Sequence, residues 1–299
     1  MVPKAYWPTA LISTMVKVLT ALVAKNISQL VEQHQLLPKN HFGGRPGRTT
    51  ADAIHYIVHK IKIAWANDRV TSVLFLDVEG AFPNAVTNRL IHNLRKRRIP
   101  EVYTRFVRVL LTNRRTRLKF DDFTSGLIEI VNGIGQGNPL SMILYIIYNA
   151  DLLKITDDDN HKTALGYIDD MALLVTSSNF EETTTKLQNL MEKSEGGLEW
   201  SRAQNSHFEM AKSAVLHMAR KTMVDLEDNR ARAPLSIPPL TVDGQVITIV
   251  QSYKYLGVQI DAQLRWKEQV QWAVANATKW LLQYRRFTRP SSSTSTKLM

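Results

Sequence analysis

The N-terminal part of the chain carries the hydrophobic spacing of two amphipathic helices. Apolar residues recur at helical intervals in the first stretch, which predicts a helix over residues 10–35. A glycine-rich turn follows at residues 42–48, and Thr49 or Thr50 then caps a second predicted helix over residues 51–66. This part of the chain is therefore expected to be helical, with a tight turn between the two helices.

Short apolar runs rich in β-forming residues alternate with helical patterns along the rest of the chain. Residues 70–78 are predicted to form a buried strand, and two apolar runs around residues 167–170 predict a hairpin over residues 164–176. The other expected helices cover residues 85–97, 101–112, 139–154, 180–196 and 264–287, and the other expected strands cover 115–120, 126–131, 208–220 and 240–260. Strands and helices in irregular order, without an internal repeat, predict an α+β fold.

Composition narrows the class of protein. Hydrophobic residues make up 44% of the 299 positions, which is enough for a buried core and excludes wholesale disorder. The chain has no cysteine, which excludes disulfide scaffolds, zinc fingers, iron–sulfur centres and thiol catalysis. No apolar run is long enough to predict a membrane span. The 38 basic and 27 acidic residues give a net charge of +11, which suggests a polyanionic partner or simply a soluble surface.

Three aspartates stand where apolar strands end. Asp77 closes the strand predicted at residues 70–78, and Asp169 and Asp170 lie in the turn of the predicted hairpin. If that strand lies beside the hairpin, the three carboxylates converge and repel one another unless cations neutralise them. Carboxylate oxygens select Mg²⁺ or Mn²⁺, and two such ions about 3.5–4 Å apart support phosphoryl transfer.

Each of these aspartates also has an ordinary structural explanation. A pair of aspartates in a turn is common turn chemistry, and Asp77 alone can serve as a helix cap. The acidic run at residues 157–159 lies in a polar loop and is expected to be solvated. The metal hypothesis rests on the apolar strands that lead directly into both acidic positions.

Motifs around these aspartates resemble those of one enzyme family. Residues 167–170, Tyr-Ile-Asp-Asp, resemble the Tyr/Phe-x-Asp-Asp motif of reverse transcriptases. Residues 75–82 are similar to their first palm motif, and residues 135–141, Gly-Gln-Gly-Asn-Pro-Leu-Ser, are similar to the motif between the two. Residues 36–50 resemble finger motifs of non-LTR (LINE-type) retrotransposons, particularly fungal ones.

Two further segments extend the resemblance, and some positions depart from it. Residues 208–212 and 255–258 are similar to the remaining palm motifs, so seven motifs over about residues 5–262 occur in the family's order. Trp7 replaces an arginine of similar elements, and Gly135 replaces a proline. The sequence shows no endonuclease region, RNase H region or Cys/His knuckle, so the chain is expected to be a fragment.

The resemblance implies an α+β palm-and-fingers polymerase fold with a truncated thumb. Residues 1–70 would form a fingers-like helical part, and residues 71–262 would form the palm with inserted fingers segments. Residues 263–288 would form a partial thumb helix. The Ser/Thr-rich residues 289–299 would form a disordered tail, and the charged segment 221–239 a loop.

The resemblance also assigns the metal-binding residues. Asp77 and Asp169 would hold two Mg²⁺ ions, or Mn²⁺ in their place, with Asp170 beside them and the Val78 carbonyl as a main-chain ligand. Lys212 would donate a proton to the pyrophosphate leaving group, although a solvated lysine is nearly as good an explanation.

Further residues would bind the nucleotide and the template. Phe82 would lie under the incoming sugar and exclude a 2′-hydroxyl, and Gln136 and Gly137 would line the nucleotide and template pocket. The alternatives are a core phenylalanine and a surface turn. Arg45 and Arg48 would contact phosphate or template, or else remain solvated in their loop.

The implied function is that of an RNA-directed DNA polymerase. It would add dNTPs to a primer 3′-hydroxyl on an RNA template by a two-metal mechanism, with no membrane partner. The localisation is left open, with an intracellular protein expected and the nucleus as the place of the chemistry if the chain is active. One alternative is an inactive retrotransposon remnant that at most binds nucleic acid. A template-independent nucleotidyltransferase is another.

The surplus of positive charge lies in one stretch. Residues 89–119 contain eleven lysines and arginines and one acidic residue, Glu101, so this stretch carries +10 of the net charge. It lies between Asp77 and Gln136 in the sequence. We therefore expect a basic patch beside the active site that binds primer and template phosphates.

Overall fold

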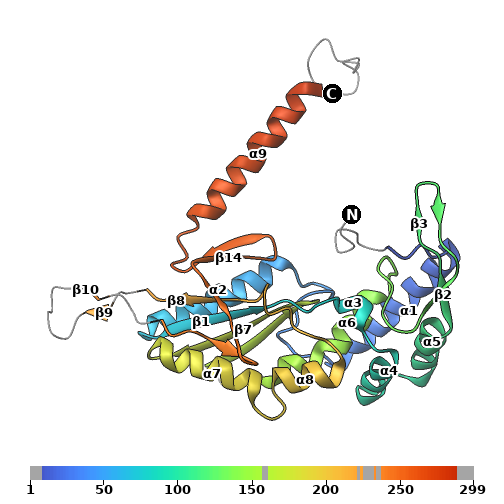
Figure 1. Cartoon of the computed structure of the whole chain (residues 1–299), viewed down its shortest axis with the longest axis horizontal. Helices are drawn as coiled ribbons and strands as arrows, with labels where there is room; N and C mark the ends of the chain where they lie inside the picture. The colour runs from blue at the N-terminus through green and yellow to red at the C-terminus, as the bar shows by residue number, and fades with distance from the viewer. Residues whose placement is uncertain (1–8, 157–160, 221–222, 225–231, 234–236, 288–299) are drawn as a thin grey trace.

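A sheet of five strands forms the centre of the molecule. The computed structural model describes residues 9–156, 161–220, 223–224, 232–233 and 237–287, so Trp7 and the predicted tail lie outside the described residues. The strand order is β13-β8-β1-β7-β6, with β13 parallel to β8 and every other pair antiparallel (Figure 1). Their bounds are Thr248–Val250 for β13, Ala214–Met218 for β8, Val70–Leu76 for β1, Asp170–Ser177 for β7 and Lys162–Tyr167 for β6.

Strand β1 is buried on both faces because helices cover the sheet on both sides. Its side chains alternate, so Val73 and Phe75 pack in one apolar cluster with the helix α2, Thr50–Ala66. Leu74 and Leu76 pack in the other cluster with α7, Phe180–Glu192, and α8, Gly197–Gln204 (Figure 1). A continuous apolar run is what such a doubly covered strand requires.

Helices and a two-ladder hairpin pack beside the sheet. Helix α1 covers Thr14–Gln33, α3 Ala81–Asn84, α4 Thr87–Lys96, α5 Glu101–Leu111 and α6 Ser141–Asn149, and a 3₁₀ segment, η2, covers Ala150–Ile155. In the hairpin, β2 (Arg114–Thr116) pairs with β5 (Ile128–Ile130), and β3 (Lys119–Phe120) pairs with β4 (Phe123–Thr124). Helix α6 is buried over almost its whole length, as its apolar sequence predicts.

Helix starts follow local capping chemistry. Thr49, rather than Thr50, caps α2: its side chain accepts a hydrogen bond from the backbone of Asp52, whose carboxylate accepts one from the Thr49 backbone. Helix α1 starts later than predicted because Ser13 is its N-cap.

Two predicted elements are wrong in extent. The helix predicted over residues 180–196 ends early, as α7 at Glu192, because the chain turns at Glu195, with φ of 59°, and at Gly196, where a Cβ would lie 2.7 Å from the Lys193 carbonyl oxygen. Helix α8 begins only after this turn. The strand predicted over 208–220 is shorter, because residues 209–213 form a hydrogen-bonded turn before β8 begins.

The C-terminal part adds small hairpins and one long helix. Strand β11 covers Thr241–Val242, β12 Gln245–Val246, β14 Ser252–Tyr255, β15 Val258–Asp261, and the short pair β9 and β10 covers Met223–Val224 and Arg232–Ala233. Helix α9, Lys267–Phe287, projects away from the sheet (Figure 1). Within the described ranges, no helix is both long enough and apolar enough to cross a lipid bilayer. The division into fingers, palm and thumb residues stays a prediction.

Candidate active site

The three aspartates meet at one end of the sheet. Strands β1 and β7 are antiparallel and pair Leu76 with Met171, so Asp77 follows β1 directly beside the start of β7 at Asp170. Asp169 lies in the turn between β6 and β7. The prediction that the strand ending at Asp77 lies next to the acidic hairpin is therefore confirmed.

The carboxylates of this cluster oppose one another's ionisation. Burial raises the pKa of Asp169, and the charge of Asp77 raises it further. The pKa of Asp170 is raised to about 6, first by loss of hydration among the surrounding protein atoms and then by the charges of Asp169 and Asp77. Asp170 keeps an exposed surface, so part of its carboxylate still meets solvent. Burial and the neighbouring carboxylates therefore act together against the ionisation of Asp169 and Asp170.

The carboxylate oxygens of the three aspartates suit divalent cations that also take ligands from a substrate. Among the described residues, neither Asp169 nor Asp170 forms an ion pair, so their charge is not neutralised by the protein. No three acidic or histidine side chains in the described ranges enclose a metal ion by themselves. Mg²⁺ typically takes one or two carboxylates and completes its shell with water and phosphate oxygens, so this open arrangement suits it.

Lys212 reaches the cluster from the turn that precedes β8. Its Nζ lies 3.4 Å from Asp77 Oδ2 and 2.6 Å from Glu209 Oε2. The hydrogen bond to Glu209 is the main cause of its raised pKa, and the charge of Asp77 adds to it. Lys212 is thus a protonated, mostly exposed ammonium at the edge of the acidic cluster.

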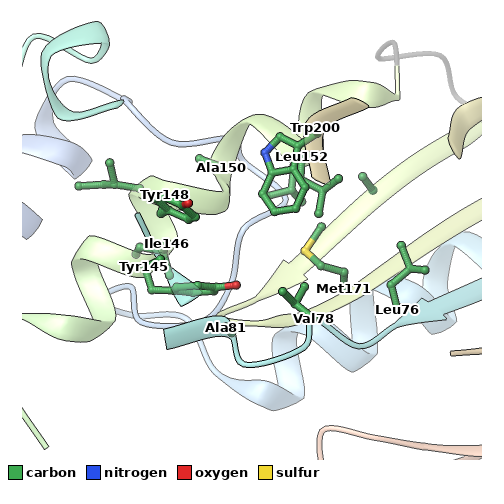
Figure 2. Packing of buried hydrophobic residues seen from close by; sticks show 14 of the residues in the cluster. Leu76, Val78, Ala81, Tyr145, Ile146, Tyr148, Ala150, Leu152, Met171 and Trp200 are labelled. Atoms are coloured by element: carbon green, nitrogen blue, oxygen red, sulfur yellow. The ribbon is translucent and has the colours of Figure 1, made fainter. Parts of the chain in front are cut away.

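Backbone contacts align this turn with the end of β1. Residues 77–79 run antiparallel to residues 207–209: Val78 pairs with Phe208, and the Glu79 amide donates to the His207 carbonyl at 2.8 Å. The Val78 side chain is buried in the core beside Ala81 (Figure 2), and its main chain directly follows Asp77.

Phe82 and the glycine-rich loop are tied together near the aspartates. The Ile134 amide donates to the Phe82 carbonyl at 2.8 Å, and the Gly133 amide donates to the Ala85 carbonyl at 2.8 Å. The ring of Phe82 is half-buried and stacks on Tyr145 with 4.8 Å between centroids. Figure 2 shows the Tyr145 hydroxyl pointing in the direction of Val78.

Gln136 and Gly137 lie in the same loop. The Gln136 carbonyl accepts a hydrogen bond from the Ala10 amide at 2.9 Å. Gly137 is exposed and has φ of 93°, a left-handed conformation that favours glycine. Ser141 at the start of α6 donates to the Gly135 carbonyl at 2.6 Å, which anchors the loop on the buried helix.

Arg45 does not behave as a solvated loop charge. Its side chain is 5% exposed and makes a bidentate pair with Glu32, at 2.6 and 2.7 Å, and it donates to the Pro38 and His41 carbonyls. The interpretation as a solvated charge is wrong, because its donors hold the loop to α1. In this arrangement the guanidinium faces protein partners and not a phosphate.

Arg48 is bound less completely than Arg45. It donates to the Lys39 and His41 carbonyls, and its guanidinium carbon lies 5.4 Å from the centre of the Phe42 ring. Its side chain keeps partial exposure, so a contact with phosphate or template stays a prediction.

The structure adds site residues that the sequence interpretation missed. Tyr145 underlies Phe82, Tyr253 stacks on Phe75 at 4.2 Å, and Glu209 fixes Lys212. Burial raises the pKa of Tyr253, and the charges of Asp170 and Asp77 raise it further. The aromatic residues in the apolar runs carried no sequence signal that separated them from ordinary core.

This fold and site define a class of nucleic-acid polymerase. Residues 3–260 match the family described as reverse transcriptase (RNA-dependent DNA polymerase), and the chain belongs to that family.

Relatives come from mobile elements. The chain is 24% identical over 270 residues to the RNA-directed DNA polymerase from mobile element jockey of Drosophila melanogaster, covering 89% of this chain and 28% of the relative. It is 23% identical over 266 residues to the Pol polyprotein from type-1 retrotransposable element R2 of Nasonia vitripennis, covering 86% of this chain and 24% of the relative. The chain thus spans about a quarter of these relatives. The resemblance to non-LTR retrotransposons is confirmed, but its fungal character is not borne out, because these elements come from insects.

Solved structures support the polymerase fold. The apo telomerase of Candida tropicalis truncated from its C-terminal domain superposes with a TM-score of 0.56 at 10% identity, over 83% of this chain and 44% of that one. The telomerase of the same organism in complex with the TWJ fragment of telomeric RNA gives a TM-score of 0.55 at 11% identity, over 81% and 36%. The expected palm-and-fingers fold is thereby confirmed at the level of the backbone.

Proposed function

We propose that this chain is the polymerase core of a retrotransposon reverse transcriptase, which extends a primer 3′-hydroxyl with dNTPs on an RNA template. The observation that carries the proposal is the meeting of Asp77, Asp169 and Asp170 at the end of β1. Membership of the reverse transcriptase family supports the same chemistry.

The acidic cluster supplies the residues that we propose as metal ligands. Reverse transcriptases generally use divalent metals. Here Asp77, Asp169 and the Val78 carbonyl would hold two Mg²⁺ ions, with Asp170 beside them. When bound, such ions lower the pKa of the primer hydroxyl and neutralise the triphosphate.

Residues of the chain itself would orient the nucleotide and donate a proton to the leaving pyrophosphate. Phe82, fixed on Tyr145, would lie under the sugar ring and exclude a 2′-hydroxyl. Gln136 and Gly137 would line the pocket for the base pair. Lys212, whose pKa is raised, would keep a proton on Nζ for the leaving pyrophosphate. Orientation and charge stabilisation would account for most of the rate.

The basic patch that would bind primer and template is smaller than the sequence count suggests. Arg97 is 6% exposed and pairs with Asp151 at 2.7 Å, and Arg95 pairs with Glu101 at 2.7 Å. Arg114 donates to the Asn132 and Gly133 carbonyls and so supports the glycine-rich loop. Arg97 and Arg114 thus serve the fold, and the charge of the exposed Arg95 is partly balanced by Glu101.

The remaining cations stay available. The exposed arginines that form no salt bridge within the described part of the chain include five near α5 and the hairpin: Arg98 in the turn before α5, Arg105 and Arg108 of α5, and Arg115 and Arg117 of the hairpin. We propose that these five, defined here as the arginine surface, bind nucleic-acid phosphates. Replacing Arg98, Arg105 and Arg108 with glutamine should flatten the slope of log affinity against log salt by about 2 to 3. Lys186, Lys193 and Arg202 replaced with glutamine serve as the control for net charge, and an equal effect of both triple variants would refute this placement.

Template-directed extension tests the proposed function. The purified chain is incubated with poly(rA)/oligo(dT), dTTP and Mg²⁺, and the product length is measured with and without template. Extension that needs both template and Mg²⁺ supports the proposal. Binding of the primer–template without extension would support the inactive remnant, and extension without template would support a template-independent nucleotidyltransferase.

A further inference from the structure

The turn that carries Asp169 has an unfavourable backbone conformation. Ile168 has φ of 60°, in the left-handed region. A β-branched side chain is rarely found there, because its Cβ substituents crowd its own backbone. Such a conformation persists only where surrounding contacts enforce it. The direction of the Asp169 carboxylate therefore depends on whatever holds Ile168.

Two buried polar side chains meet at this turn. The Asn149 side-chain amide donates to the Ile168 carbonyl, and the Asn149 Oδ1 accepts a hydrogen bond from His41 Nε2 at 3.2 Å. Both Asn149 and His41 are completely buried. Burial lowers the pKa of His41 to about 4, so the ring is neutral at pH 7. Because Asn149 Oδ1 can only accept, the hydrogen of this neutral ring lies on Nε2. His41 thereby fixes the orientation of the Asn149 amide, which in turn holds the turn.

The two supports are themselves anchored in different parts of the molecule. The loop that carries His41 pairs with β6: the Phe42 amide donates to the Gly166 carbonyl at 2.8 Å, and the Gly166 amide donates to the Asn40 carbonyl at 3.1 Å. Asn149 is the last residue of α6, whose first residue anchors the glycine-rich loop. The chain His41, Asn149, Ile168 thus connects the N-terminal loop, the buried helix and the acidic turn.

We propose that Asn149 and His41 are positioning residues that hold Ile168 in its left-handed conformation and so direct the Asp169 carboxylate toward Asp77. This inference rests on the proposed polymerase function. Neither side chain touches a substrate in this scheme. Their effect reaches the reaction only through the backbone of the turn.

The test uses the fact that glycine adopts this conformation without support. In the full chain, Asn149→Ala should reduce kcat for dTTP incorporation by about tenfold or more, with the KM for dTTP changed by less than about twofold. Adding Ile168→Gly to Asn149→Ala should restore kcat by about threefold or more, because glycine pays no steric cost there. Ile168→Val in the same background is the matched control, and it should restore nothing because valine is also β-branched.

A second readout does not depend on activity. Hydrogen–deuterium exchange of the peptide over residues 166–170 should be faster in Asn149→Ala than in the wild type, and exchange elsewhere in the sheet should be unchanged. If Asn149→Ala fails to fold, His41→Phe tests the same relay, because it removes the donor to Asn149 and leaves an aromatic ring, although a larger one, in its place. His41→Phe should then show the same local acceleration of exchange.

The outcomes separate this inference from the proposed function. A wild-type chain without extension activity would refute the proposed function, and the exchange comparison would still decide whether Asn149 holds the turn. Unchanged kcat and unchanged exchange in Asn149→Ala would overturn the inference. Equal rescue by glycine and valine at position 168 would overturn it as well.

Discussion

Replacing Gly43 with alanine should displace the acidic turn. A Cβ on Gly43 would lie 2.5 Å from the Ile168 backbone nitrogen and 2.8 Å from the Tyr167 carbonyl carbon. Ordinary contacts begin at 3.4 Å, so the loop and the turn must separate by about 0.9 Å, the difference between 3.4 and 2.5 Å. Both contacts are to backbone, so no side-chain rotation relieves the overlap.

The size of the effect follows from this displacement. A shift of about 1 Å at a catalytic group typically lowers the rate about 100-fold, so kcat for single-nucleotide incorporation should fall by about that factor. The overlap should also lower the free energy of unfolding by about 1 to 3 kcal/mol, as overpacking does. Rapid-quench incorporation measures the first quantity, and urea unfolding measures the second.

Gly126 provides a matched control for this experiment. A Cβ there would have no atom within 4 Å, so Gly126→Ala should leave both rate and stability unchanged. A folded Gly43→Ala protein with a rate within about twofold of wild type would refute the argument that close backbone packing sets the position of the turn.

The remaining predictions concern the ion pair of the loop, the charge of the cluster and the choice of sugar. In urea titrations, Glu32→Gln should lower the free energy of unfolding by about 2 kcal/mol. This is less than for a fully buried ion pair, because Glu32 is about a third exposed. An unchanged free energy of unfolding would mean that the Arg45–Glu32 pair contributes nothing to stability. The raised pKa of Asp170, about 6, means that the folded protein binds this proton more tightly than the unfolded chain. Without metal, the contribution of Asp170 to the free energy of unfolding should therefore be highest below pH 4 and should fall as the pH rises to about 6. In thermal melts with EDTA, Asp170→Asn should remove this fall. A contribution of Asp170 that rises over the same pH window would contradict the raised pKa. Phe82→Ala should raise incorporation of ribonucleotides relative to deoxynucleotides by about tenfold or more, and unchanged selectivity would exclude Phe82 as the residue that excludes the 2′-hydroxyl.

The sequence was most informative where local chemistry and burial pointed the same way. Apolar runs ending at Asp77 and around Asp169 predicted buried strands with acidic ends, and the antiparallel pairing of β1 with β7 brings those ends together. A cap at Thr49 or Thr50 likewise predicted the start of α2, and the structure decides for Thr49, whose capping interaction with Asp52 is made within four residues.

The sequence was least informative where distant residues decide the outcome. Arg45 is held by Glu32 on a preceding helix, and no local pattern distinguishes it from the partly exposed Arg48 three residues later. Asn149 meets His41 across 108 positions of sequence, so its role depends on how α6 packs against the loop. Pairings of this kind follow from tertiary packing and leave no periodicity in a single sequence.

Single-turnover incorporation by Asp169→Asn tests the central claim most directly. Asparagine keeps the size of the side chain and removes the charge that would hold a metal ion, so the protein should still fold and still bind primer–template. With saturating Mg²⁺, poly(rA)/oligo(dT) and dTTP, the wild-type chain should extend the primer, and Asp169→Asn should do so about 1,000-fold more slowly or not at all. Incorporation by Asp169→Asn at the wild-type rate would contradict the account.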